Sequence, residues 1–264
     1  MLKVRYTVSY NDIYDLRKEV EAMLQGLFNY DNPVWRYIGK FGDLMLLNLL
    51  WIICSIPVFT IGASTTAVYY VTLKLVRDED GYTFRSFFRS FRENFKQATV
   101  IWLLLLGTGL ILLIDIRFFL IVLTGDSVVR TLFTAAVGAL TILWLFILTY
   151  VFPLQCRFYN PVKRTLFNAF FMSIRHFFHT LGMLGIDAVV LFMAYLSFFY
   201  MPQLSVLMIL FGFPLIAFIN SYIFNGIFKR YMPEATRQDG EELKPILEDV
   251  RLTPQPASSK EKED

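Results

Sequence analysis

The chain has 264 residues, of which 56% are hydrophobic and 17% aromatic, with a mean hydropathy of +0.50 and a formal net charge of +3. These values exclude a soluble globular core of this length and are typical of a polytopic all-α membrane protein, a transmembrane helical bundle. The excess of Lys and Arg lies beside apolar runs, where membrane insertion and lipid headgroups account for it. We therefore expect the lipid bilayer as a partner and no nucleic acid.

Hydropathy divides the chain into three segments. We expect a cytoplasmic N-terminal segment at 1–40, a transmembrane helical domain at 41–228, and a polar, largely disordered cytoplasmic tail at 229–264. For the N-terminus two alternatives stand: a cytoplasmic helix over Asp12 to Leu24, or a translation start at Met23. Within the tail, Glu241 to Val250 has the length of a short docking helix.

The first apolar region, Phe41 to Val76, is too long for one membrane helix. Pro57 and Gly62 interrupt it, and both favour a break in a helix. Two helices, the second one short, would give six membrane helices and a cytoplasmic N-terminus. One tilted helix would give five membrane helices and an external N-terminus. The internal repeat described below favours six.

Four further apolar runs each supply about 20 residues, enough to cross a hydrocarbon layer of about 30 Å as a helix. They are Gln97 to Leu123, Val128 to Val151, Leu181 to Met201 and Leu204 to Phe228. The connections Lys74 to Lys96 and Arg157 to Arg175 are rich in Lys and Arg, whereas the opposite turns have little net positive charge. The positive-inside rule then places both basic connections and both chain ends in the cytoplasm of a multi-pass cell-membrane protein.

A short pattern occurs twice in the basic connections. Phe87 to Phe95 recurs as Phe170 to Phe178, with the shared motif FFxS, then Phe or Ile, then Arg, and a span follows at the same offset. We therefore predict a parallel internal repeat with two cytoplasmic interfacial amphipathic helices. Two roles stand for them: anchoring in the headgroup region, or docking another protein. The candidate interface residues are Phe84, Arg85, Phe88, Arg89, Phe91, Arg92 and Arg175.

Polar side chains within the predicted membrane spans are the second indication of a functional site. Asn48, Asp187, Asn220 and Asn225 all fall within a few helical turns of the predicted cytoplasmic surface, where they are expected to form one buried polar cluster. An ionisable residue such as Asp187 inside a span suggests a contact with a solute or a proton. Hydrogen bonding between helices that only fixes their packing is the alternative.

Catalytic and cofactor motifs are missing from the sequence. His176 and His179 have helical spacing but no HExxH context, and the phosphate-binding and nucleophile-elbow patterns do not occur. We expect no metal, no cofactor and no enzymatic activity.

Several N-terminal motifs carry a family resemblance. They are Gly26 to Trp35, Gly42-Asp43-Leu44 with Asn48 to Trp51, Ile56 to Ala67, and the basic aromatic run Phe84 to Phe95. Over about residues 23–230 the chain resembles the YesL family of bacterial membrane proteins, domain of unknown function 624.

The resemblance implies a plasma-membrane component encoded near carbohydrate importers of the ATP-binding-cassette (ABC) type and polysaccharide-degrading enzymes, and it defines no site residues. It therefore implies an accessory or regulatory component of such an importer, with permease subunits as partners. The alternative is a small stand-alone transporter or channel with a polar cluster around Asp187. No oligomeric state is predicted.

Overall fold

The computed structural model describes residue 18 and residues 33–79, 81–121, 128–200 and 202–231. Secondary structure in these residues is helical: α2 (Pro33–Ser55), the 3₁₀ turn η1 (Val58–Thr60), α3 (Ile61–Val76), α4 (Thr83–Ile121), α5 (Val128–Arg157), α6 (Val162–Arg175), α7 (Phe177–Tyr200) and α8 (Pro202–Lys229). The all-α prediction is confirmed. Apart from Lys18, which is helical, the alternatives at Asp12 to Leu24 and Met23 lie outside the described residues, as does the tail helix Glu241 to Val250.

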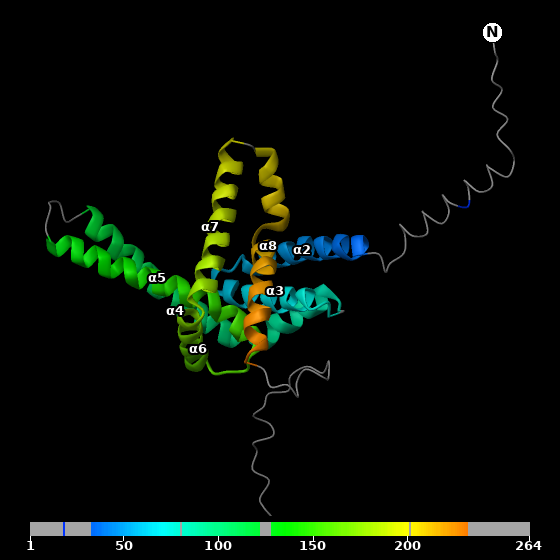
Figure 1. Ribbon diagram of the computed structural model, residues 1–264, viewed down its shortest axis with the longest axis horizontal. Coiled ribbons are helices and arrows are strands. Elements are labelled where there is room, and N and C mark those ends of the chain that lie inside the picture. Colours follow the sequence, from blue (N-terminus) through cyan, green and yellow to red (C-terminus); the bar gives the residue numbers. More distant parts are fainter. Residues whose placement is uncertain (1–17, 19–32, 80, 122–127, 201, 232–264) are drawn as a thin grey trace, which may run out of the picture.

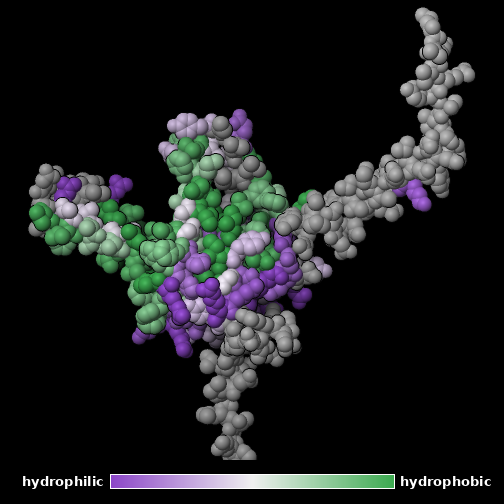
Figure 2. Space-filling model, in the orientation of Figure 1, coloured by the Kyte–Doolittle hydropathy of each residue, from purple (hydrophilic) through white to green (hydrophobic). Residues whose placement is uncertain are grey.

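Five of the described helices, α2, α4, α5, α7 and α8, are long and apolar enough to cross a bilayer. Many of their large apolar side chains are exposed, among them Leu113 and Ile114 on α4 and Leu191 and Phe192 on α7. Figure 2 shows this apolar surface over the projecting helices and a hydrophilic surface at the base. Exposed apolar area of this extent is unfavourable in water, so the chain is a multi-pass membrane protein whose helices contact lipid.

The first apolar region is divided between two helices, as predicted. α2 ends at Ser55, because the residue before Pro57 is driven out of helical geometry, and η1 turns the chain. The Thr60 hydroxyl donates to the carbonyl oxygens of Cys54 and Pro57, both at 2.6 Å, which satisfies backbone groups freed by the break. Trp102 of α4 adds a bond to the Val58 carbonyl at 2.7 Å.

α3 returns the chain to the level at which α2 begins. Lys40 near the start of α2 forms an ion pair with Asp78 just after α3, and Trp51 reaches Thr65 near the start of α3. With 16 residues, α3 rises about 24 Å, and it is almost completely buried. α3 is thus the short helix of the six-helix prediction. The other five are the helices that are long and apolar enough to cross a membrane by length and composition.

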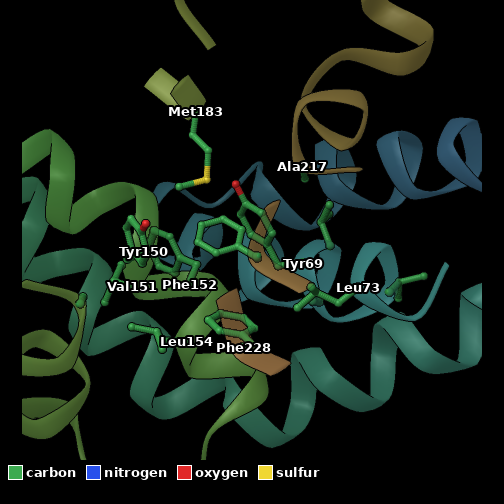
Figure 3. Close-up of a cluster of buried hydrophobic side chains, with 14 of the residues drawn as sticks. Tyr69, Leu73, Tyr150, Val151, Phe152, Leu154, Met183, Ala217 and Phe228 are labelled. Carbon is green, nitrogen blue, oxygen red and sulfur yellow. The ribbon is translucent and has the colours of Figure 1, made fainter. Parts of the chain in front are cut away.

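The long helices form two hairpins that diverge. α4 pairs with α5 and α7 pairs with α8, and the two hairpins extend in different directions from a common base (Figure 1). The core lies at this base, where α3 is covered by α2, α4, α5 and α8. Figure 3 shows its side chains, including Tyr69 of α3, Tyr150 of α5 and Phe228 of α8.

The two copies of the FFxS pattern differ in backbone. The first is not a separate interfacial helix, because α4 continues without interruption from Thr83 through the apolar run. Lys96, Gln97, Ala98 and Thr99, which join the two parts, include no helix breaker. The second copy forms the separate helix α6, and His176 leaves helical geometry (φ −107°, ψ 41°) before α7 begins.

Candidate functional site

Asp187 and Asn220 form a polar pair between the helices of the second hairpin. The amide nitrogen of Asn220 on α8 donates to the Asp187 carboxylate on α7 at 2.8 Å. Asn220 is completely buried and its Oδ1 has no described partner, whereas Asp187 is half-buried. The buried tyrosine Tyr69 of α3 lies beside both residues. This arrangement is expected when a polar residue in a span must find a partner on a neighbouring helix.

Asn48 belongs to a different place, the kink of α8. There Gly212 has non-helical dihedral angles (φ 21°, ψ −121°), and Pro214 removes one backbone donor. A methyl group added at Gly212 would lie 3.2 Å from Asn48 Oδ1, so the amide packs directly against the broken backbone. A polar side chain at such a break can satisfy backbone groups that lipid cannot.

The structure therefore brings together two of the four residues expected to form one cluster. Asn225 is half-buried and lies five residues beyond Asn220, which turns it by about 140° around α8. Nearby, Thr72 of α3 and Ser221 of α8 share a buried hydrogen bond of 2.8 Å that the sequence analysis did not single out.

The predicted interface residues gather mainly on the first turns of α4. Phe84 and Phe88 are 55% and 39% exposed, and Arg85, Arg89 and Arg92 are exposed as well. We call Phe84, Arg85, Phe88, Arg89 and Arg92 the basic aromatic face. Phe91, by contrast, is half-buried among Phe87 and Phe95. Arg175 is held at α6, where its guanidinium lies 5.6 Å from the centre of the Tyr231 ring.

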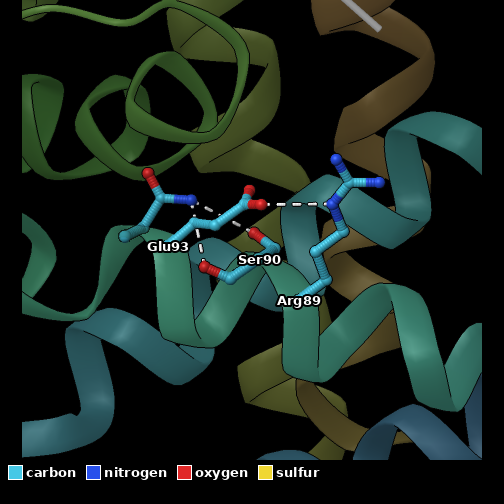
Figure 4. Close-up of polar contacts among 4 residues, drawn as sticks. Arg89, Ser90 and Glu93 are labelled. Atoms are coloured by element: carbon cyan, nitrogen blue, oxygen red, sulfur yellow. Dashed lines mark hydrogen bonds and ion pairs between the residues drawn. The ribbon is translucent and has the colours of Figure 1, made fainter.

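Sequence reasoning missed a polar network at the base of the first hairpin. Gln155 of α5 donates to Gln97 of α4 at 2.6 Å and accepts a bond from Thr165 of α6 at 3.2 Å. Asn94 donates to the carbonyl and hydroxyl oxygens of Ser90 one turn earlier on α4 (Figure 4). Gln155 is 4% exposed, so this network ties three helices together inside the core. In the sequence, Gln155 lies in an otherwise apolar run two residues before Arg157, and this polar residue was the one indication of the network.

Residues 33–79, 81–121, 128–200 and 202–231 contain no group of three His, Cys, Asp or Glu side chains that could hold a metal ion. His176 and His179 lie with ring centres 5.8 Å apart, and His176 Nε2 shares a hydrogen bond of 2.9 Å with the Tyr231 hydroxyl. The bond to Tyr231 attaches the residues just after α8 to the α6–α7 junction.

Helices of this length, exposure and pairing define a multi-pass helical membrane protein with one hydrophilic end. Residues 44–116 match the family model described as "Protein of unknown function, DUF624". The chain is also 26% identical over 174 residues to the Bacillus subtilis (strain 168) protein named "Uncharacterized protein YesL", covering 62% of this chain and 80% of that protein. No solved structure matches.

The family model covers three of the motifs that carry the resemblance, Asn48 to Trp51, Ile56 to Ala67 and Phe84 to Phe95. Together with the similarity to YesL it confirms the resemblance predicted from the sequence. The chain is a YesL-like protein related to the DUF624 family.

Proposed function

We propose that this protein is a non-catalytic accessory or regulatory component of an ABC-type carbohydrate importer, and that it contacts the permease subunits through its basic aromatic face. The observation that carries the proposal is the shape of α4. Its first 14 residues, 83–96, continue a membrane helix and present two exposed Phe rings among three exposed Arg side chains. Arg and aromatic residues are the types enriched where proteins bind one another.

In this proposal the basic aromatic face and both chain ends lie in the cytoplasm of a cell-membrane protein. The basic residues of α4 and α6 support this orientation through the positive-inside rule. The identity of the partner as an ABC-type importer rests on the genomic context that the family resemblance implies. Since the nucleotide-binding motifs are missing here, ATP would be bound by another chain.

Affinity purification from the native host in mild detergent, followed by mass spectrometry, tests the proposal. We expect permease subunits to copurify with the wild-type chain and to be lost with the double variant Phe88→Ala/Arg92→Gln. The matched control, Leu113→Ala/Arg117→Gln, removes an exposed apolar and an exposed basic residue from the other end of α4 and should leave copurification unchanged. Recovery of the wild-type chain without permease subunits would refute the proposal.

A second function, a small stand-alone transporter or channel, is motivated by the ionisable Asp187 between α7 and α8. The geometry favours it less, because Asp187 already has a partner on the adjacent helix of its own hairpin. If Asp187 contacts a transported solute or proton, Asp187→Asn should abolish the transport of that solute or proton in reconstituted vesicles. Absence of flux in the wild-type vesicles would rule this function out.

A further inference from the structure

A cavity of about 470 Å³ opens where α3 ends and α4 begins. Its walls come from three stretches: Tyr70 and Lys74 on α3, Tyr82 in the connection, and Arg85, Ser86 and Arg89 on α4. Tyr70 and Lys74 are half-buried, whereas Tyr82 is 83% exposed and lies at the mouth. The cavity is separate from the Asp187–Asn220 pair.

The cavity is strongly cationic. Lys74, Arg85 and Arg89 all line it, and the described lining residues include no carboxylate. The Lys74 ammonium lies 5.0 Å from the centre of the Tyr70 ring, which orients it. Nearby carboxylates are paired with other cations: Asp78 with Lys40 at 2.7 Å and Glu79 with Arg77.

Arg89 is the one lining cation with a described carboxylate partner. Its Nε donates to Glu93 at 3.1 Å, and the far end of its guanidinium points away from Glu93 (Figure 4). This exposed pair, one turn apart on α4, offsets only part of the charge of the cavity. The described lining residues therefore carry an excess of positive charge beside the Ser86 hydroxyl.

We propose that this cavity binds a phosphate group, carried by an anionic lipid headgroup or by a soluble phosphate. Arginine side chains present planar pairs of N–H donors that match phosphate oxygens, and lysine adds a compact charge. The hydroxyls of Ser86 and Tyr82 are further donors of suitable chemistry. The cavity volume is more than ten times the volume of about 30 Å³ that a water molecule occupies in the liquid, which leaves room for a group larger than water.

The rim of the cavity favours the lipid as the source. Phe84 and Phe88 follow Tyr82 on the outside of α4, with their ring centres 4.8 Å apart, and both are exposed. Phenylalanines on the apolar face of a basic amphipathic helix are buried at the boundary between headgroups and acyl chains. A headgroup phosphate can then enter from the bilayer without leaving the interface.

Lipid retention on the full-length detergent-purified protein tests this site. Native mass spectrometry after mixing with phosphatidylglycerol should show bound lipid on the wild-type chain and at least a fivefold loss for Lys74→Gln/Arg85→Gln. Lys96→Gln on the same helix lies outside both the lining and the basic aromatic face, and it should change retention less than twofold. Arg85→Gln alone keeps the test available if the double variant is not monodisperse, because Arg85 is exposed.

A second arm separates the two sources. Thermal stabilisation by inorganic phosphate in lipid-free detergent, lost in Arg85→Gln, would assign the site to a soluble phosphate, and retention of phosphatidylglycerol alone would assign it to lipid. Neither response in the wild-type chain would overturn the proposal. Equal losses for Lys96→Gln and Arg85→Gln, or equal retention of oleate, which has a carboxylate, would also overturn it. The permease copurification test uses Phe88 and Arg92, so its failure would leave this result unaffected.

Discussion

The two copies of the internal repeat use the same sequence pattern to build different geometry. In the first copy, α4 contains both the basic amphipathic turns and the membrane span in one helix. α3, which precedes it in the chain, packs along α4. In the second, α5 packs closely on the separate helix α6, and α7 turns away to pair with α8. α4 thus runs unbroken through the first copy, whereas the break at His176 separates α6 from α7, which pairs with α8.

The local cause lies around the shared serine. Ser90 and Ser173 are both buried. In the first copy the side-chain amide of Asn94 donates to the Ser90 carbonyl, and both residues lie within the continuous helix α4. In the second, His176 leaves the helix and the Thr180 hydroxyl donates to the Ser173 carbonyl at 2.8 Å, across the break. A side chain therefore replaces a backbone donor at the break, which lets α7 change direction without leaving that carbonyl unsatisfied.

The largest expected effect concerns the side of the membrane. Arg92 and Arg175 occupy equivalent positions in the two copies and both are exposed. With Cys54 and Cys156 replaced by alanine, Arg92→Cys and Arg175→Cys should both react with a membrane-impermeant maleimide in inside-out vesicles and stay unreacted in intact cells. Labelling of only one of them in intact cells would show that the repeat is not parallel.

The second expected effect is on the close packing of the first copy. A Cβ at Gly62 would lie 2.5 Å from the Ala98 carbonyl oxygen and from Trp102 Cβ, so α3 and α4 would have to separate. We expect Gly62→Ala to cost about 1–3 kcal/mol of stability, measured as a lower thermal midpoint in detergent. In the second copy Gly185 has open space around it. Gly185→Ala should cause no loss of stability, because the added methyl group meets open space and alanine has the higher helix propensity. A loss equal to that of Gly62→Ala would contradict the packing difference.

The third expected effect concerns the hydrogen bond between Asp187 and Asn220, which only the second copy can form. The position equivalent to Asp187 in the first copy is Leu104, which is exposed on α4. A double-mutant cycle with Asp187→Leu and Asn220→Leu should give a coupling of about 0.6–2 kcal/mol, the range for hydrogen bonds between membrane helices. Chemical denaturation in mixed micelles measures it. Additive single effects would show that the pair does not hold α7 to α8.

The smallest effect is a pH dependence at the break. Burial, then His179, Arg230 and Arg175, hold the pKa of His176 below its ordinary value of 6.5. The folded state thus favours the neutral ring. Its contribution to stability is fully present above pH 6.5 and is lost as the pH falls through 6.5 toward the lowered value.

Thermal midpoints at pH 7.5 and 5.5 test this dependence. The wild-type midpoint should fall slightly more on acidification than that of His176→Gln, which cannot titrate at this position. The first copy has Glu93 at the equivalent position, paired with Arg89. Identical shifts in the two proteins would show that His176 does not contribute.

Long apolar runs and basic connections were enough to predict the helices, because lipid-length hydrophobic segments leave few structural options. Pro57 likewise predicted the break between α2 and α3. The break at His176 had no comparable signal. There the second copy has His176 where the first copy has Glu93, and neither residue type breaks a helix. The geometry of the break depends on the bonds that His176 and its surroundings make with Thr180 and Tyr231.

The candidate site shows the same division. Depth along a helix follows from counting residues, so the sequence alone placed Asn48, Asp187 and Asn220 inside the membrane domain. Which of them meet depends on how helices rotate and bend around one another. The kink at Gly212 took Asn48 to the α8 backbone and left Asp187 with Asn220. The amino-acid sequence by itself determined the helical membrane class and the basic connections, while tertiary packing decided the partners, because directional hydrogen bonds form only between side chains that the packed helices bring into contact.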